Sequence, residues 1–207
     1  MKMMKKTTFL IAIMCIISLG MMGQDIGITG DSTINQCETK TYTISILNNS
    51  GNPLTNLEIT GRLGNLTGFS YVTGTTTIDV NGGAICNGAG DNDEPVVSGT
   101  DLIWDIDTRC PNNSPFTLAN GQTLYITFSL ATDCTAVSGS LNVHFEYEIS
   151  GTPMADDTGA HSIQVLPGGV TIKKTPNVIP QYLGQDVTWT LTIENSGYGI
   201  IENVVVT

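Results

Sequence analysis

The chain has 207 residues, of which 40% are hydrophobic, and this is enough for one or two domains with cores of their own. Nineteen acidic residues against eight basic ones give a net charge of −11. Binding to nucleic acid needs clustered Lys and Arg side chains, so this charge argues against a nucleic-acid partner. The acidity is instead typical of an extracellular protein that repels its own copies.

Residues 1–23 are typical of a secretory signal peptide. Three lysines precede an apolar run over Phe9–Met22, and polar sequence begins near Gln24. The run is shorter than the 18 or more apolar residues of a membrane-spanning helix, so we expect cleavage and no membrane span in the mature chain. An uncleaved anchor and lipidation at Cys15 are the alternatives. The protein is therefore expected to be secreted or held at the cell surface.

From residue 26 onward apolar side chains alternate with polar ones. Tyr42, Ile44 and Ile46 alternate with threonine and serine, which predicts a strand with one buried and one solvated face. Turn sequences rich in Asn and Gly separate such segments, and no segment shows a helical period. The expected strands are Thr39–Leu47, Leu57–Thr60, Leu102–Ile106, Leu124–Leu130 and Leu141–Ile149.

This succession of short strands predicts an all-β fold, namely an immunoglobulin-like β-sandwich over residues 26–165. About 140 residues suffice for an independent core. The length in excess of a typical sandwich lies in the glycine-rich insertion of residues 61–100.

Four cysteines remain after residue 23, and in an exported chain this even number indicates disulfides with three connectivities open. We favour Cys37–Cys134 together with Cys86–Cys110. Cys37 lies just before the first expected strand and Cys134 just after the fourth. If these strands are antiparallel neighbours, the start of one lies near the end of the other, as a disulfide requires. The second disulfide would then fasten the glycine-rich insertion.

Part of the first module recurs near the end of the chain. Residues 41–60 align with residues 188–207 without a gap, at a spacing of 147 positions. A repeat at a domain-sized interval indicates an array of modules. The identical positions of the first copy are Thr41, Thr43, Ile46, Asn48, Asn56 and Thr60.

The second copy is predicted to be an incomplete module, residues 170–207, joined by a linker at residues 166–169. The linker is so short that neighbouring modules should sit end to end with limited freedom. Three strands are too few for a sandwich, so Trp189 and Leu191 would stay uncovered, and we expect only the N-terminal part of a module. The candidate strands are Val170–Lys173, Val187–Glu194 and Ile201–Thr207.

The second copy also carries the motifs Lys174-Thr175, Gly184-Gln185-Asp186, Asn195-Ser196-Gly197 and a strand ending in Val206-Thr207. In these motifs it resembles the bacterial conserved repeat domain, known as domain of unknown function eleven. The first module looks like a divergent member, in which Cys37 replaces the glycine that stands at position 184. The resemblance implies an immunoglobulin-like stalk or spacer repeat of a large secreted or surface-attached protein, without catalytic residues.

The best candidate for a bound ion is an acidic loop that contains Asp91, Asp93 and Glu94. Calcium takes six to eight oxygen ligands, and a glycine-flanked acidic loop can supply several. The spacing does not match an EF-hand, and a solvated acidic loop without an ion is the alternative that we favour. No other cofactor is expected.

Catalysis is not expected. His144 falls on the polar face of its strand, His161 starts the last strand of the module, and no Gly-x-Ser-x-Gly elbow or Ser/His/Asp arrangement is visible. We therefore expect a non-catalytic stalk or spacer whose partners are the adjacent repeat modules of the same chain. The alternatives are a module that binds surface glycans or proteins through Tyr125 and the insertion, and an accessory domain of a larger secreted enzyme.

Overall fold

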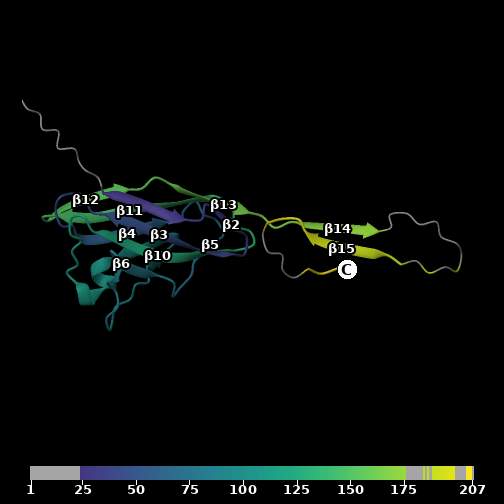
Figure 1. Ribbon diagram of the computed structural model, residues 1–207, viewed down its shortest axis with the longest axis horizontal. Coiled ribbons are helices and arrows are strands. Elements are labelled where there is room, and N and C mark those ends of the chain that lie inside the picture. Colours follow the sequence, from purple (N-terminus) through teal and green to yellow (C-terminus); the bar gives the residue numbers. More distant parts are fainter. Residues whose placement is uncertain (1–23, 176–183, 185, 187, 199–203, 207) are drawn as a thin grey trace, which may run out of the picture.

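The structure is a computed structural model that describes residues 24–175, 184, 186, 188–198 and 204–206. The expected signal peptide, residues 1–23, lies outside them. Two β-sheets pack face to face, and a two-stranded hairpin extends from one end of this sandwich (Figure 1). The prediction of an all-β sandwich is confirmed, and its immunoglobulin-like type stays a prediction.

The first sheet is centred on two long antiparallel strands, β3 and β10. Their register runs from Leu47 opposite Thr123 to Thr39 opposite Ala131, so the two strands are the antiparallel neighbours that the cysteine argument requires. The sheet has six strands in the order β1-β3-β10-β6-β7, with β5 also pairing with β10. Their bounds are β1 Asp25–Gly30, β3 Thr39–Leu47, β5 Phe69–Tyr71, β6 Thr77–Val80, β7 Gly83–Ala84 and β10 Thr123–Thr132.

The second sheet has seven strands in the order β2-β13-β11-β4-β9-β8, with β12 also pairing with β11. Strand β4 shifts register against β11 between Glu146 and Glu148. This irregularity contains Asn56, whose φ of 51° is a left-handed conformation that Asn tolerates better than most residues. The bounds are β2 Thr33–Asn35, β4 Thr55–Arg62, β8 Val96–Ser98, β9 Asp101–Asp105, β11 Gly139–Ile149, β12 Thr152–Asp157 and β13 His161–Leu166.

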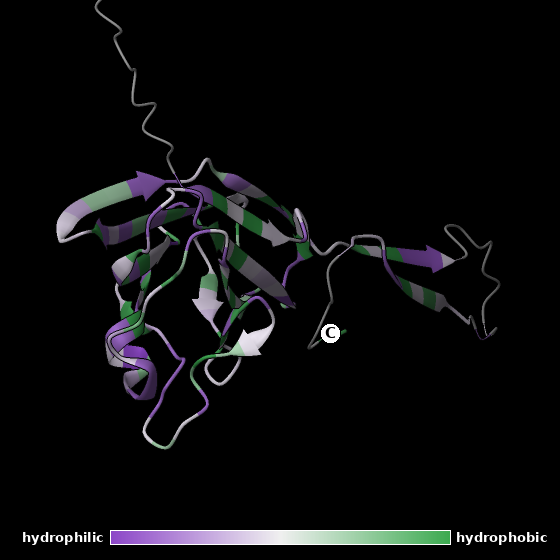
Figure 2. Ribbon diagram, turned by 60° about the vertical axis from the view of Figure 1, so that its left-hand side comes forward, coloured by the Kyte–Doolittle hydropathy of each residue, from purple (hydrophilic) through white to green (hydrophobic). Residues whose placement is uncertain are grey.

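The apolar positions of the alternating strands form one core between the sheets. Trp104 of β9 is fully buried and its ring lies 5.2 Å from that of Phe128 on the opposite sheet, centroid to centroid. The alternation is visible as green and purple bands along the strands (Figure 2). Buried side chains of the main strands are Tyr42, Ile44, Ile46, Leu57, Ile59, Leu102, Leu124, Ile126, Val143 and Phe145. The inward positions predicted from the period of two are therefore confirmed.

The structure contains two short helices that the sequence prediction missed. They are α1 (Ile106–Arg109) and a 3₁₀ turn (Pro111–Asn113). Asp105 caps α1, because its carboxylate accepts from the Thr108 amide at 3.2 Å. One helical turn is too short to show a 3.6-residue period, so the lack of a helical period in the sequence did not exclude these two turns.

The insertion of residues 61–100 is built into both sheets. It supplies β5, β6 and β7 to the first sheet and β8 to the edge of the second. It therefore extends the sandwich instead of forming a separate loop.

The hairpin consists of β14 (Val170–Thr175) and β15 (Thr190–Asn195). In its register Ile172 lies opposite Ile193, as Ile26 lies opposite Ile46 in the β1–β3 pair of the sandwich. The predicted strand at residues 201–207 has no counterpart in the described residues 204–206, and its other residues lie outside the described part of the chain. The first strand pair of the sandwich is thus repeated in the hairpin.

The two copies differ in burial at equivalent positions. Tyr42, Ile44 and Ile46 are 0% exposed. The residues 147 positions later are Trp189, Leu191 and Ile193, and these are 39%, 50% and 38% exposed. The hairpin therefore carries the face that forms the core of the sandwich, but without a covering sheet among the described residues.

Candidate functional site

The acidic loop is held by hydrogen bonds to the protein itself. Asp91 accepts from the Gly88 amide at 2.7 Å, and from the backbone and side-chain nitrogens of Asn112 at 3.1 and 2.9 Å. Partial desolvation raises the pKa of Asp91, but these hydrogen bonds to the charged form outweigh it and lower the pKa below its ordinary value. Asp91 thus fastens the loop to the 3₁₀ turn.

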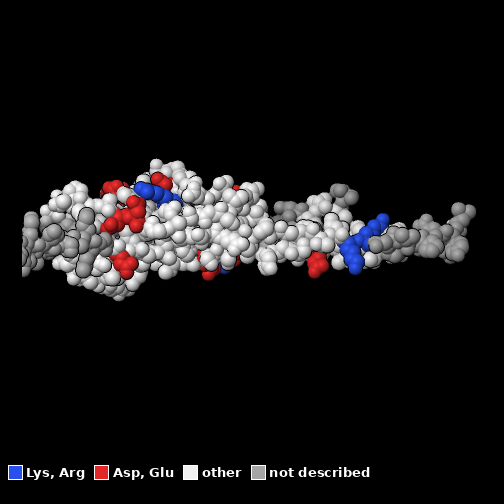
Figure 3. All heavy atoms as spheres, turned by 90° about the horizontal axis from the view of Figure 1, so that it is seen from above, with Lys and Arg blue, Asp and Glu red and all other residues white. Residues whose placement is uncertain are grey.

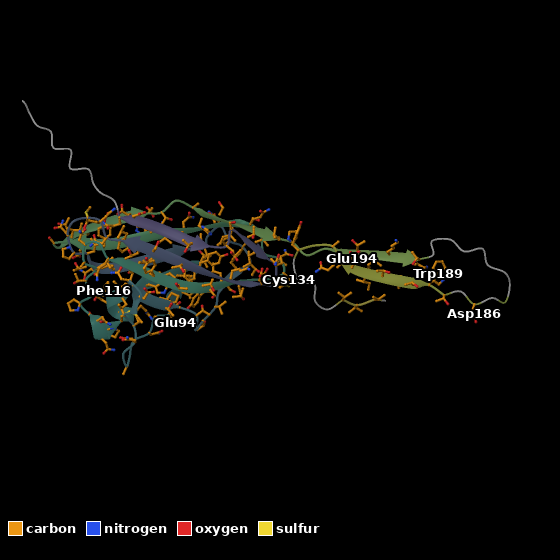
Figure 4. The ribbon with its side chains drawn as sticks, viewed as in Figure 1. Glu94, Phe116, Cys134, Asp186, Trp189 and Glu194 are labelled. Atoms are coloured by element: carbon orange, nitrogen blue, oxygen red, sulfur yellow. A yellow bond between two sulfur atoms is a disulfide. The ribbon has the colours of Figure 1, made fainter. Side chains whose placement is uncertain are left out.

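Glu94 and Asp93 accept hydrogen bonds from other parts of the sandwich, near β5 and from Trp104 of β9. Glu94 accepts from the Tyr71 hydroxyl at 2.6 Å and from the Gly74 amide at 2.9 Å, which ties the loop to the end of β5 (Figure 4). The indole nitrogen of Trp104 donates to the Asp93 carbonyl at 3.1 Å. Burial raises the pKa of the Asp93 carboxyl. Burial, together with the hydrogen bond to Glu94, raises the pKa of Tyr71 to about 12.

The carboxylates of Asp91 and Glu94 thus accept from different partners, and Asp93 is held through its backbone carbonyl. Among the described residues, no group of three or more His, Cys, Asp or Glu side chains is placed to hold a metal ion. Calcium at Asp91, Asp93 and Glu94 stays a prediction.

Both predicted disulfides are present. Cys37 is bonded to Cys134 with their Cα atoms 5.1 Å apart, and Cys86 to Cys110 with a Cα separation of 4.7 Å. The first joins the start of β3 to the end of β10, as predicted from their antiparallel pairing. The second spans residues 87–109, which include the acidic loop, β8 and β9. Figure 4 shows Cys134 at the end of the sandwich next to the hairpin.

An acidic groove of about 380 Å³ lies on the second sheet. Leu57, Pro153 and Met154 contribute apolar wall. Most acidic side chains in view lie on the sandwich, with basic side chains beside them, and the hairpin carries both signs of charge (Figure 3). The carboxylates of the groove are Glu58, Asp105, Asp107, Glu146 and Glu148.

A second groove, of about 270 Å³, lies in the insertion. We call it the apolar groove. Leu63, Phe69, Tyr71 and Val97 line it, and Val97 is 57% exposed on the edge strand β8. Tyr125 does not contribute to it, because it lies on β10 and is half-buried instead of exposed as predicted. The sequence signal for this groove was only the length of the insertion.

The two histidines lie where the sequence placed them. His144 faces out from β11 with both ring nitrogens engaged, Nδ1 to Asp157 at 2.9 Å and Nε2 to Glu146 at 3.0 Å. His161 is the first residue of β13, and its ring packs edge-on against Tyr42 at a centroid distance of 6.0 Å. No serine, threonine or cysteine nucleophile is hydrogen-bonded to either ring among the described residues. Among the same residues, no helix has the length and apolar character needed to cross a membrane.

No protein-family model matches the chain, and no curated protein matches it. Several solved structures match the chain. The complete structure of manganese lipoxygenase of Gaeumannomyces graminis, with a partial structure of zonadhesin of Komagataella pastoris, matches at 11% identity and a TM-score of 0.44, over 67% of this chain and 46% of that one. An exo-β-N-acetylglucosaminidase from Vibrio harveyi matches at 10% identity and a TM-score of 0.39, over 78% and 21%.

A family 123 glycoside hydrolase from Clostridium perfringens matches at 11% identity and a TM-score of 0.29, over 69% of this chain and 27% of that one. The chain therefore spans less than half the length of these three structures. At such identities and TM-scores the likenesses carry no statement about activity, substrate or partner.

Proposed function

We propose that this chain is a non-catalytic stalk or spacer of a secreted or cell-surface protein, built from modules of the conserved repeat type described above. The observation that carries the proposal is the recurrence of one strand pair. β1 and β3 of the sandwich return as β14 and β15, with the same antiparallel pairing and with an isoleucine pair at the corresponding register, Ile26–Ile46 and Ile172–Ile193. A chain that repeats a structural unit along its length suits a spacing role better than a single-site role.

Two further features support an extracellular location. Disulfides persist in oxidising compartments such as the periplasm and the cell exterior, and the sandwich carries two. Residues 1–23 have the pattern of an export signal. The Asp91 and Glu94 carboxylates of the predicted ion site accept structural hydrogen bonds.

The test is surface labelling together with ligand screening. A short epitope inserted at Gly151, in the exposed β11–β12 turn, should become accessible to antibody on intact cells, and deletion of residues 1–23 should abolish this labelling. Residues 24–169 should retain no ligand from a glycan array. Labelling only after cell lysis would refute the extracellular stalk, and a specifically retained glycan would favour the alternative below.

The apolar groove favours a second candidate, a module that binds a glycan or protein. Its aromatic wall and the exposed Val97 provide the kind of surface that such ligands cover. If a ligand is found, Val97→Lys should abolish its retention. Val137→Lys is the matched control, because Val137 is similarly exposed, at 51%, and does not line the groove. An accessory role beside a secreted enzyme is the third candidate, and it shares the export evidence.

A further inference from the structure

Every residue of the linker is held by a hydrogen bond or by its own ring. The Leu166 carbonyl accepts from the Gln36 amide at 3.2 Å. Pro167 has its φ fixed by the pyrrolidine ring. The Gly168 amide donates to the Gln36 side-chain oxygen at 3.3 Å, and the Gly169 carbonyl accepts from the Ser196 amide at 2.9 Å. A linker so short and so fully bonded has no freely rotating residue between its two ends.

On the hairpin side, the linker packs against the turn after β15, residues 195–198. The Tyr198 amide donates to the Pro167 carbonyl at 3.3 Å. A Cβ atom built on Gly197 would lie 2.2 Å from the Gly169 nitrogen and 2.8 Å from the Pro167 oxygen. Glycine at position 197 is therefore required by direct contact between two backbones.

The same turn exists in the sandwich. The Asn195 side-chain oxygen accepts from the Gly197 amide at 3.1 Å, and 147 residues earlier the Asn48 oxygen accepts from the Ser50 amide at the same distance. In both copies the amide of the middle residue of this turn, Asn49 or Ser196, is hydrogen-bonded to the segment that enters the module. Asn49 donates to the Gln24 side chain at 3.3 Å, where Ser196 donates to Gly169.

On the sandwich side, the Cys37–Cys134 disulfide fixes the residue that holds the linker. Gln36 precedes Cys37 directly, and its side-chain nitrogen donates to the Ala136 carbonyl at 3.3 Å. The Cys37 amide donates to the Asp133 carbonyl at 3.4 Å. Gln36 is therefore anchored to the loop after β10 by the disulfide and by its own side chain.

From these contacts we propose that the linker is a rigid joint, in which Gln36 on one side and the turn of residues 195–198 on the other clamp residues 166–169 and fix the angle between consecutive modules. The inference rests on the stalk role proposed above and deepens it, because fixed joints make a stiff rod and free ones a flexible chain. Figure 1 shows the hairpin continuing the long axis of the sandwich, as such a rod requires.

Amide hydrogen exchange and ¹⁵N relaxation of the oxidised chain, residues 24–207, test the joint. We expect the Gly168, Ser196 and Tyr198 amides to exchange roughly tenfold more slowly than unstructured amides, which corresponds to about 1.4 kcal/mol. The hairpin and the sandwich should tumble with one correlation time. Exchange of these amides at unstructured rates, or independent tumbling, would overturn the proposal.

Two pairs of variants locate the clamp. Gly197→Ala should return Ser196 and Tyr198 to unstructured exchange, whereas Gly159→Ala, a change at an open glycine, should not. Gln36→Ala should uncouple the tumbling of the hairpin without exposing the Ser196 amide. Gln36→Glu keeps the oxygen that accepts from Gly168 but loses the donor to Ala136, so it should reduce the coupling less than Gln36→Ala does. Equal behaviour of these two variants would contradict the role of Gln36. Surface labelling is independent of all these measurements, so the stalk location and the joint can fail separately.

Discussion

Asn48 shows why particular polar residues recur inside this fold. Its side chain is 0% exposed, yet each of its polar atoms has a partner. The nitrogen donates to the carbonyls of Asn52 and Leu118, each at 2.8 Å, and the oxygen accepts from Ser50. The residue thus links the β3–β4 turn to the segment before β10. The bond of its oxygen to the amide two residues on recurs at Asn195.

We predict that Asn48→Ala destabilises the sandwich by about 2–3 kcal/mol, since the Leu118 and Asn52 carbonyls each lose one of two donors and the Ser50 amide loses its acceptor. Chemical denaturation of residues 24–169 measures the loss. Asn65→Ala, at an exposed asparagine, should change the unfolding free energy by less than about 0.5 kcal/mol. Equal effects of the two variants would show that burial of Asn48 is not what matters.

Cys37 occupies a left-handed position, with φ at 60°, and its counterpart in the repeat, Gly184, has φ at 87°. A non-glycine residue in this region costs roughly 1–2 kcal/mol. The disulfide to Cys134 fixes Cys37 in this conformation. The replacement of glycine by cysteine, noted from the sequence, therefore exchanges conformational freedom for a crosslink.

A comparison of double variants separates these two effects. Cys37→Ser with Cys134→Ser should lose about 3–5 kcal/mol, the value of a long crosslinked loop. Cys37→Gly with Cys134→Ser should be more stable than that variant by about 1 kcal/mol. Cys37→Ser with Cys134→Gly is the matched control and should show no such gain in the denaturation midpoint. A gain in the control alone would contradict the backbone argument.

The lowered pKa of Asp91 predicts that the stability of the folded chain depends on pH. Its pKa is lowered in the folded chain, so its hydrogen bonds contribute stability that is fully present above the ordinary aspartate pKa of about 3.9. This contribution is lost as the pH falls through the lowered value. Asp91→Asn should therefore be less stable than the parent at pH 7, and the two should converge in acid. Thermal melts from pH 7 to pH 2 measure the difference, and an unchanged gap across that range would contradict it.

Asp25→Asn, a change at an exposed carboxylate, controls for the loss of one negative charge. The chain is strongly acidic, so removal of any carboxylate reduces self-repulsion. The control should therefore be neutral or slightly stabilising at pH 7. A loss of stability that Asp91→Asn shows and Asp25→Asn does not therefore measures the hydrogen bonds of Asp91 in the loop.

At the scale of elements, the strands were predictable where one face is buried and one is solvated. β3 and β11 alternate along their central residues, and β10 alternates as far as Phe128, because each crosses the core. The short strands β5, β7 and β8 have few or no buried residues and so no periodic signal. The same holds for α1, whose single turn is set by the Asp105 cap.

The disulfides were predictable for a different reason. The Cys37–Cys134 disulfide followed once β3 and β10 were taken as antiparallel neighbours, as in an immunoglobulin-like sheet, and Cys86–Cys110 was then the remaining pair. The partners of Asp91 and Glu94 could not, because Tyr71 and Gly74 lie at the end of β5 and Asn112 lies in the 3₁₀ turn, both distant in sequence from the acidic loop. Hydrogen bonds between loops leave no local pattern. For that reason the sequence of the acidic loop suggested a bound ion, whereas the structure shows hydrogen bonds from Asp91 and Glu94 to the protein itself.

At the scale of the whole molecule, burial divides the chain into two unequal parts. The sandwich is closed by two sheets around a continuous core. The hairpin exposes Ile172, Leu191 and Ile193 on one face, at 65%, 50% and 38%. Lys174 covers part of this face, with its ammonium 3.9 Å from the centre of the Trp189 ring. A cation–π contact of this kind contributes about 0.5–1 kcal/mol at an exposed site, far less than a covering sheet would.

We therefore predict that residues 170–207 are not stable when expressed alone. An isolated two-stranded hairpin is marginal in water, and this fragment also lacks the linker residues that bond the turn after β15. Circular dichroism should show no cooperative thermal transition for the fragment, whereas residues 24–169 should unfold in one transition. A cooperative melt of the fragment would mean that its own residues bury Trp189 and Leu191. In that case the apolar face would belong to a complete small fold, and the comparison with the core of the sandwich would fail.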